Sequence, residues 1–171
     1  AGLLADCTAE EERALQDYGR YLGTAFQLID DLLDYSSDGE RLGKNVGDDL
    51  NEGKPTLPLL HAMHHGTPDQ SAMIRGAIEQ GNGRHLLDAV LETMATCGSL
   101  EWTQKRAEEE ADKAIAALQI LPDTPWREAL IGLAHIAVQR ANLLHFLRRQ
   151  RIFHHAAEIR AVVLRRQRQW N

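Results

Sequence analysis

The chain has 171 residues, of which 43% are hydrophobic, and a formal net charge of −6; it can therefore bury the core of one ordinary domain and does not have the composition of a wholly disordered protein. Its charge is uneven, because residues 141–171 hold seven arginines and one glutamate, a net +6, so the first 140 residues carry −12. An acidic body does not suit a nucleic-acid surface, which needs a basic stripe, and it favours a site that gathers cations.

Helix signals dominate the chain, and no run of residues alternates in the manner of a strand. Thr8 and Glu11 form a capping box that predicts a helix reaching about Tyr35. Residues 36–53 hold glycines among charges without apolar periodicity, which predicts a long loop. Further helices are predicted over about 55–65, from Pro68 onward, and over 83–97, 99–119 and 125–140. We therefore predict an all-α helical bundle with one glycine-rich interruption.

Cys7 and Cys97 stand in unrelated contexts, so neither a disulfide framework nor a structural zinc site is indicated. This cysteine usage favours a cytoplasmic location. No apolar run approaches the length that spans a bilayer, so we expect no transmembrane segment. The chain begins with Ala-Gly-Leu-Leu and not with Met, which is typical of a processed chain or of a fragment.

The stretch FQLIDDLLDY, residues 26–35, places three aspartates among leucines. At 100° per residue, Asp30, Asp31 and Asp34 share one helix face with Gln27, while apolar residues fill the remaining arc. We therefore expect a helix that is buried on most sides and turns its carboxylates toward an internal cavity. No lysine or arginine lies one turn away from them, so nothing nearby in the sequence cancels their repulsion.

Two interpretations of this acidic face remain open. A solvated face is the simpler one, but such faces usually pair their own charges, as residues 104–113 do at i, i+4 spacing. The other is a metal site, because Mg²⁺ prefers a few carboxylates completed by water and phosphate oxygens. The uncompensated charge favours the metal site.

The glycine-rich stretch LGKNVGDDLNEGKPTLP, residues 42–58, adds Lys44 and Lys54 just after the acidic helix. Lysine serves phosphate as a point charge, and glycine lets backbone N–H groups approach it. The stretch is not a Walker A loop, because the spacing is wrong and no strand precedes it. A mobile surface loop is the alternative, but beside three aspartates the stretch predicts a Mg²⁺-diphosphate site.

These residues resemble the trans-polyprenyl diphosphate synthases, and within that family the long-chain octaprenyl type. The resemblance rests on Gly23, on FQLIDDLLD, on LGK at 42–44 and on GDDLNEGKPTLPLL at 47–60. It implies an all-α bundle of the isoprenoid synthase type around a deep apolar cavity, assembled as a homodimer. It also implies Mg²⁺-dependent, head-to-tail condensation of isopentenyl diphosphate with an allylic diphosphate, giving a long-chain polyprenyl diphosphate for a quinone side chain.

The resemblance also implies roles for single residues. Asp30, Asp31 and Asp34 would hold Mg²⁺ against the allylic diphosphate, and Asp30, Asp31 and Lys44 would be the catalytic residues. Gln27, Lys44 and Lys54 would contact the allylic diphosphate or its metal shell. Asp49 and Lys54 fit a loop that closes over the site.

The sequence departs from the family in two places. The earlier DDxxD motif and the upstream basic residues that bind isopentenyl diphosphate have no counterpart, so we expect residues 1–140 to be the C-terminal part of an incomplete domain. Residues 141–171 form a basic tail of unassigned origin that matches nothing in the family. A basic amphipathic helix for a membrane or nucleic acid is one interpretation of this tail, and a non-native extension is the one we favour.

Three functions remain open at this stage. The first is an enzyme part that is inactive without its other half. The second is a non-catalytic subunit of the same fold, and the third is an unrelated helical interaction module whose acidic face is incidental. The acidic face and the GK stretch argue against the third.

Overall fold

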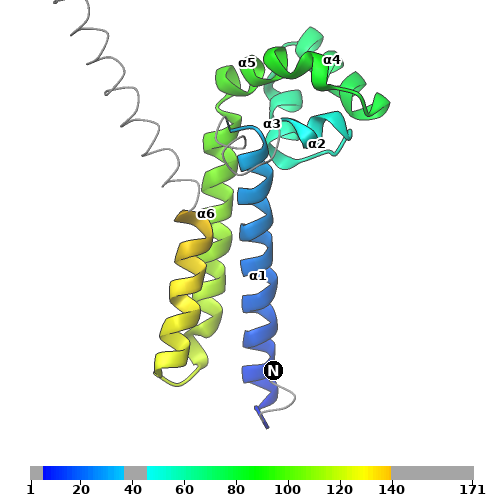
Figure 1. The fold of residues 1–171 in the computed structure, drawn as a ribbon. Helices are drawn as coiled ribbons and strands as arrows, with labels where there is room; N and C mark the ends of the chain where they lie inside the picture. The colour runs from blue at the N-terminus through cyan, green and yellow to red at the C-terminus, as the bar shows by residue number, and fades with distance from the viewer. Residues whose placement is uncertain (1–5, 37–45, 140–171) are drawn as a thin grey trace, which may run out of the picture.

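The computed structural model describes residues 6–36 and 46–139, and within these residues every regular element is a helix (Figure 1). The predicted all-α class is therefore confirmed. The α-helices are α1 (Ala9–Asp34), α2 (Asp48–Asn51), α3 (Leu57–His65), α4 (Pro68–Gln80), α5 (Leu87–Cys97) and α6 (Ser99–Ala117). Short 3-10 turns, η3 (Arg84–Leu86) and η4 (Leu118–Ile120), adjoin α5 and α6, and a last helix covers residues 125–139.

The long helix α1 begins where the capping box predicts. The Thr8 hydroxyl accepts from the Glu11 amide at 3.2 Å, and the Glu11 carboxylate accepts from the Thr8 amide at 2.9 Å. Acidic residues fill the first turn, where the helix dipole favours negative charge. With 26 residues, α1 spans about 39 Å and carries the three aspartates to its far end.

Helices α1 and α6 lie side by side and run in opposite directions, with the 125–139 helix beside them (Figure 1). Small residues make the close approach: Ala25 of α1 and Ala107 and Ala111 of α6 are buried in one cluster with Ile29. Near the other end of α1, the Tyr18 hydroxyl donates to a backbone carbonyl of the last helix at 2.8 Å. These contacts fix the axis of α1.

Helices α2 to α5 gather at the aspartate end of α1 (Figure 1). Their core contains the fully buried side chains of Leu50, Leu59, Ile74, Val90 and Met94, and Tyr35 at the end of α1 packs into it. This cluster sets the position of the chain that follows the aspartates.

Two expectations from the sequence need correction. The predicted loop over 36–53 contains a helix, α2, whose Leu50 enters the core because it meets the α4–α5 region. The prediction that α1 is buried on most sides is wrong for the described residues, since Gly23 is exposed and Phe26 is 47% exposed. The apolar arc of α1 is wide, but α6 and its neighbours cover only part of it.

The uncovered arc forms an apolar groove of about 420 Å³ between α1 and the last helix. Gly19, Gly23 and Phe26 line it from α1, and Leu133 and Ile136 line it from the other side. A Cβ atom at either glycine would meet nothing within 4 Å, so the groove is open at these positions. Among the described helices, none is both long and apolar enough to cross a membrane.

The turns on either side of α2 need the left-handed backbone conformation of Gly47 and Gly53, and this requirement can be tested by substitution. Gly53 has φ +68°, and a Cβ there would lie 2.5 Å from the carbonyl oxygen of Ile78. We expect Gly53→Ala to lower the free energy of unfolding by at least about 2 kcal/mol in urea denaturation, because left-handed strain and a backbone clash combine. Gly76→Ala is the matched control, since a Cβ there meets nothing within 4 Å. It should raise stability by about 0.5–1 kcal/mol, and equal effects of the two variants would contradict this account.

Candidate metal and diphosphate site

The aspartates occupy the C-terminal turns of α1, where they are least favoured. The helix dipole places partial negative charge at this end, and the last turn contains no basic residue. Asp31 is buried, with 7% of its surface exposed, and Asp34 is half-buried. Desolvation raises the cost of each charge, so the cluster requires a cation from elsewhere in the fold.

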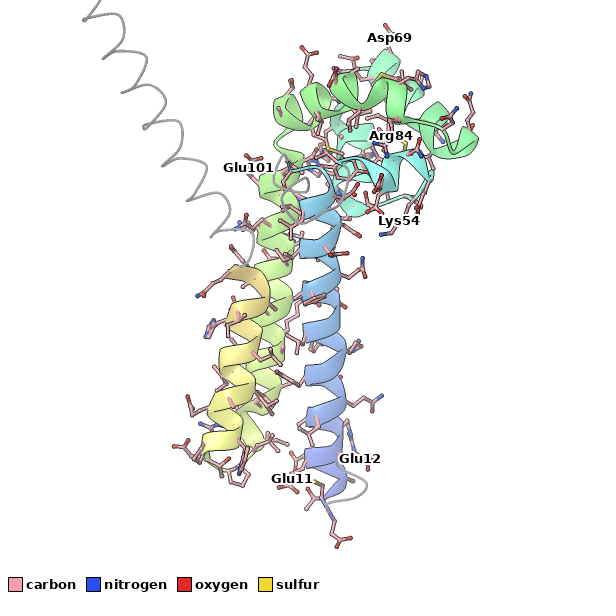
Figure 2. The ribbon with its side chains drawn as sticks, in the orientation of Figure 1. Glu11, Glu12, Lys54, Asp69, Arg84 and Glu101 are labelled. Carbon is pink, nitrogen blue, oxygen red and sulfur yellow. The ribbon has the colours of Figure 1, made fainter. Side chains whose placement is uncertain are left out.

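Lys54 supplies that cation. Its ammonium lies 3.0 Å from one Asp31 carboxylate oxygen and 3.2 Å from both carboxylate oxygens of Asp49. Figure 2 shows Lys54 beside the aspartate end of α1. The expectation that no base within one helical turn neutralises the aspartates holds for Asp31, whose cation comes from a distant segment. Lys54 lies 23 positions after Asp31 in the chain. A search for charge partners three or four residues away on the same helix therefore does not find it.

The segment that carries Lys54 is tied to α1 by backbone contacts as well. The Asp49 amide donates to the Asp34 carboxylate at 3.0 Å, and the Gly47 amide donates to the Asp34 carbonyl at 2.9 Å. Gly47 has φ +79°, which favours glycine, and it precedes the first turn of α2. Residues 47–54 thus close over the end of α1.

The Gln27 amide donates to Asp31 Oδ1 at 2.8 Å, the same oxygen that accepts from Lys54. The predicted common face of Gln27 and Asp31 is thereby confirmed, because the two lie one helical turn apart. Lys44 lies outside the described residues. Asp30 lies on the same end of α1 and is partly buried.

The site shifts the pKa values of Asp34, Asp49 and Lys54. Burial raises the pKa of Asp34 to about 6, the nearby Asp49 and Asp48 carboxylates add to the rise, and the Asp49 amide opposes it. Burial also raises the pKa of Asp49, against the lowering effect of Lys54. Burial lowers the pKa of Lys54, but its hydrogen bonds to Asp31 and Asp49 outweigh burial and the net pKa is raised.

The donor set suits a hard cation that keeps water and ligand oxygens in its shell. Carboxylates on one helix end are what Mg²⁺ takes from a protein before substrate phosphates complete its octahedron. The described residues hold no group of three His, Cys, Asp or Glu side chains already arranged around one point. The carboxylate oxygens of Asp30, Asp31 and Asp34, on one end of α1, are donors of the kind that Mg²⁺ accepts alongside water and phosphate oxygens.

Two histidines one turn apart on α3 have a packing role. His61 stacks on His65 with ring centroids 4.0 Å apart and lies 4.5 Å from the Trp102 ring. Its Nδ1 lies 3.1 Å from the Ser99 hydroxyl. These contacts join α3 to α6.

The raised pKa of Asp34 predicts a pH effect on stability. The folded chain holds this proton more tightly than the unfolded chain does, so the contribution of Asp34 to stability falls as pH rises from about 4 through about 6. We expect Asp34→Asn, whose amide oxygen still accepts from Asp49, to gain on the order of 1 kcal/mol at pH 7.5 and nothing at pH 4, after allowance for solvent screening. Asp112→Asn, the same substitution at an exposed position of α6, is the matched control in melting curves at both pH values. A gain of Asp34→Asn that is the same at both pH values would contradict the assignment.

Comparisons with known proteins agree with this architecture. The family model "Polyprenyl synthetase" matches residues 1–94. The octaprenyl diphosphate synthase of Escherichia coli (strain K12) is 85% identical over 140 residues, which cover 82% of this chain and 43% of that protein. The octaprenyl diphosphate synthase of Haemophilus influenzae is 59% identical over the same coverage.

Solved structures show the same fold. A decaprenyl diphosphate synthase from Rhodobacter capsulatus matches with a TM-score of 0.74 at 38% identity, over 82% of this chain and 43% of that chain. A polyprenyl synthase from Caulobacter crescentus, complexed with calcium and isoprenyl diphosphate, matches with a TM-score of 0.72 at 43% identity, over 80% of this chain and 42% of that chain. The chain thus spans less than half the length of these relatives. Its helical fold is that of the isoprenoid synthases, and the chain belongs to the polyprenyl synthetase family.

Proposed function

We propose that this chain forms the acidic, diphosphate-binding wall of a Mg²⁺-dependent prenyltransferase. The reaction is the head-to-tail condensation of isopentenyl diphosphate with an allylic diphosphate, which gives a long-chain polyprenyl diphosphate for a quinone side chain. The observation that carries the proposal is the cluster at the end of α1, where Asp31 and Asp34 meet the segment of Asp49 and Lys54. A homodimeric assembly, which rests on the family alone, and a cytoplasmic location, which the cysteine usage favours, complete the proposal.

The proposed chemistry makes definite demands on this wall. The allylic C–O bond breaks, its electron pair leaves on the diphosphate, the double bond of isopentenyl diphosphate forms the new C–C bond, and a proton is lost. Negative charge therefore develops on the departing diphosphate, and Mg²⁺ supplies positive charge beside it. Asp30, Asp31 and Asp34 bind the ion in this proposal, while Gln27, Lys44 and Lys54 contact the diphosphate or its shell. The Caulobacter relative is complexed with calcium and isoprenyl diphosphate, which supports a site for a divalent cation and a diphosphate in this fold.

A non-catalytic subunit or inactive fragment of the same fold is the second candidate. The chain covers 43% of its 85%-identical relative, and its sequence contains a single DDxxD motif, at Asp30–Asp34. The groove beside Phe26 and Gly23 exposes apolar surface that a larger fold would cover. Both candidates share the proposed metal site. They differ in whether this chain takes part in catalysis.

The metal site predicts binding that depends on the aspartates. We expect calorimetry to show Mg²⁺ binding that strengthens when pyrophosphate is present, and at least about tenfold weaker binding in the double variant Asp30→Ala, Asp34→Ala. The control is Asp69→Ala, Asp112→Ala, which removes the same charge at exposed positions and should bind as the unmodified chain does. Equal weak binding by the unmodified chain and the Asp30, Asp34 variant would remove the metal site.

The missing motif predicts a result for activity. Two diphosphates must be held at once before ionisation becomes easy, and groups that act as a unit lose their effect far more than proportionally when half are absent. We expect no radiolabelled polyprenyl product from isopentenyl and farnesyl diphosphates with the purified 171-residue chain. Activity should return only on mixing with the part of the fold that this chain does not cover. Product from the chain alone that disappears in Asp30→Ala would prove the fragment interpretation wrong.

A further inference from the structure

Lys54 bridges carboxylates from two different helices. Asp31 belongs to α1, Asp49 belongs to α2, and the ammonium lies within 3.2 Å of oxygens from both. The Asp31 and Asp49 side chains are largely buried, whereas the Lys54 side chain is 43% exposed. An ammonium in this arrangement does what a bridging metal ion does, because it brings together two acids that would otherwise repel.

Other groups around the cluster already have their own partners. Asp34 accepts from the Asp49 amide, and Asp48 pairs with Arg84 of η3. Asp31 Oδ1 accepts from both Gln27 and Lys54. A cation that approaches Asp31 Oδ1 therefore meets two donors that already use this oxygen.

Mg²⁺ and the Lys54 ammonium compete for Asp31 Oδ1. A carboxylate oxygen has two lone pairs, and both already accept hydrogen bonds here, from Gln27 and from Lys54. An ion that binds this oxygen must therefore displace a donor, and its charge repels the Lys54 ammonium but not the neutral Gln27 amide. Because the Lys54 side chain is long and 43% exposed, it can swing toward solvent, while Asp31 is held in the helix.

We propose that Lys54 is a built-in competitor for the metal: its ammonium holds Asp31 and Asp49 together in the ligand-free chain, and an ion that binds Asp31 displaces it toward the incoming diphosphate. This inference rests on the proposed function and adds an exchange between two cations. The exchange couples the binding of the two ligands, because Mg²⁺ frees the Lys54 ammonium and the diphosphate then binds to it. Lys54 is thus a positioning residue before binding and a diphosphate ligand afterwards.

The test compares Mg²⁺ alone with pyrophosphate at saturating Mg²⁺, by calorimetry on the 171-residue chain. In Lys54→Met we expect Mg²⁺ alone to bind about fivefold tighter, since a partly screened competing ion pair is gone. Pyrophosphate at saturating Mg²⁺ should bind about fivefold weaker, since its lysine is gone. Lys54→Arg keeps a cation and should restore the Mg²⁺ affinity of the unmodified chain to within about twofold.

Lys113→Met is the matched control, because it removes the same charge from an exposed salt bridge on α6. Lys113 lies near Tyr21, which is about 15 Å along α1 from Asp31 and beyond a Debye length at physiological salt. Both affinities should stay within about twofold of those of the unmodified chain. If Lys54→Met does not keep its helical circular dichroism, Lys54→Gln makes the same comparison while retaining hydrogen-bond donors.

Opposite changes in the two affinities support the exchange, because a purely structural lysine would weaken both. Mg²⁺ affinity in Lys54→Met that is unchanged or lower overturns the inference and leaves the aspartate site in place. No Mg²⁺ binding by any variant, the unmodified chain included, overturns the proposed metal site together with the inference.

Discussion

The repulsion among carboxylates at the end of α1 is the constraint on which the rest of this structure depends. The helix dipole, partial burial and the close spacing of the aspartates all disfavour negative charge there. The fold answers with one ammonium from Lys54 and one backbone amide from Asp49, both carried by residues 47–54, the segment that contains α2. Local charge balance therefore determines where that segment lies.

The remaining helices hold these few groups at fixed distances. Alanines between α1 and α6 let the two backbones approach, so α1 cannot slide or tilt without opening the cluster around Ile29. At the other side of the site, Leu50 anchors α2 in the core of α3 to α5, and this anchors Asp49 as well. The site is thus held between two separate apolar clusters. Their packing fixes the positions of the site's carboxylates, although the packed side chains do not contact a ligand in the proposed site.

Much of this arrangement could be predicted from the sequence, because the decisive patterns are local. The Thr8 capping box, the ends of the helices predicted over 55–65 and 83–97, and the shared face of Gln27 and Asp31 all depend on residues within one or two turns. The pairing of Lys54 with Asp31 depends on how α2 and the residues after it pack against the end of α1. Helical periodicity within α1 does not predict that packing. The exposed groove at Phe26 was missed for a related reason, since an apolar arc shows what a helix prefers to bury but not which neighbours are present.

The glycine at position 83 links the site to a distant part of the chain. Its φ of −83° is one that any residue adopts, yet a Cβ there would lie 2.8 Å from Leu50 Cγ and 2.9 Å from the Leu50 carbonyl oxygen. Leu50 is the neighbour of Asp49, so added volume at the α4–α5 corner pushes directly on the segment that closes the site. A side chain at position 83 would therefore disturb the acidic end of α1 without touching any of its carboxylates.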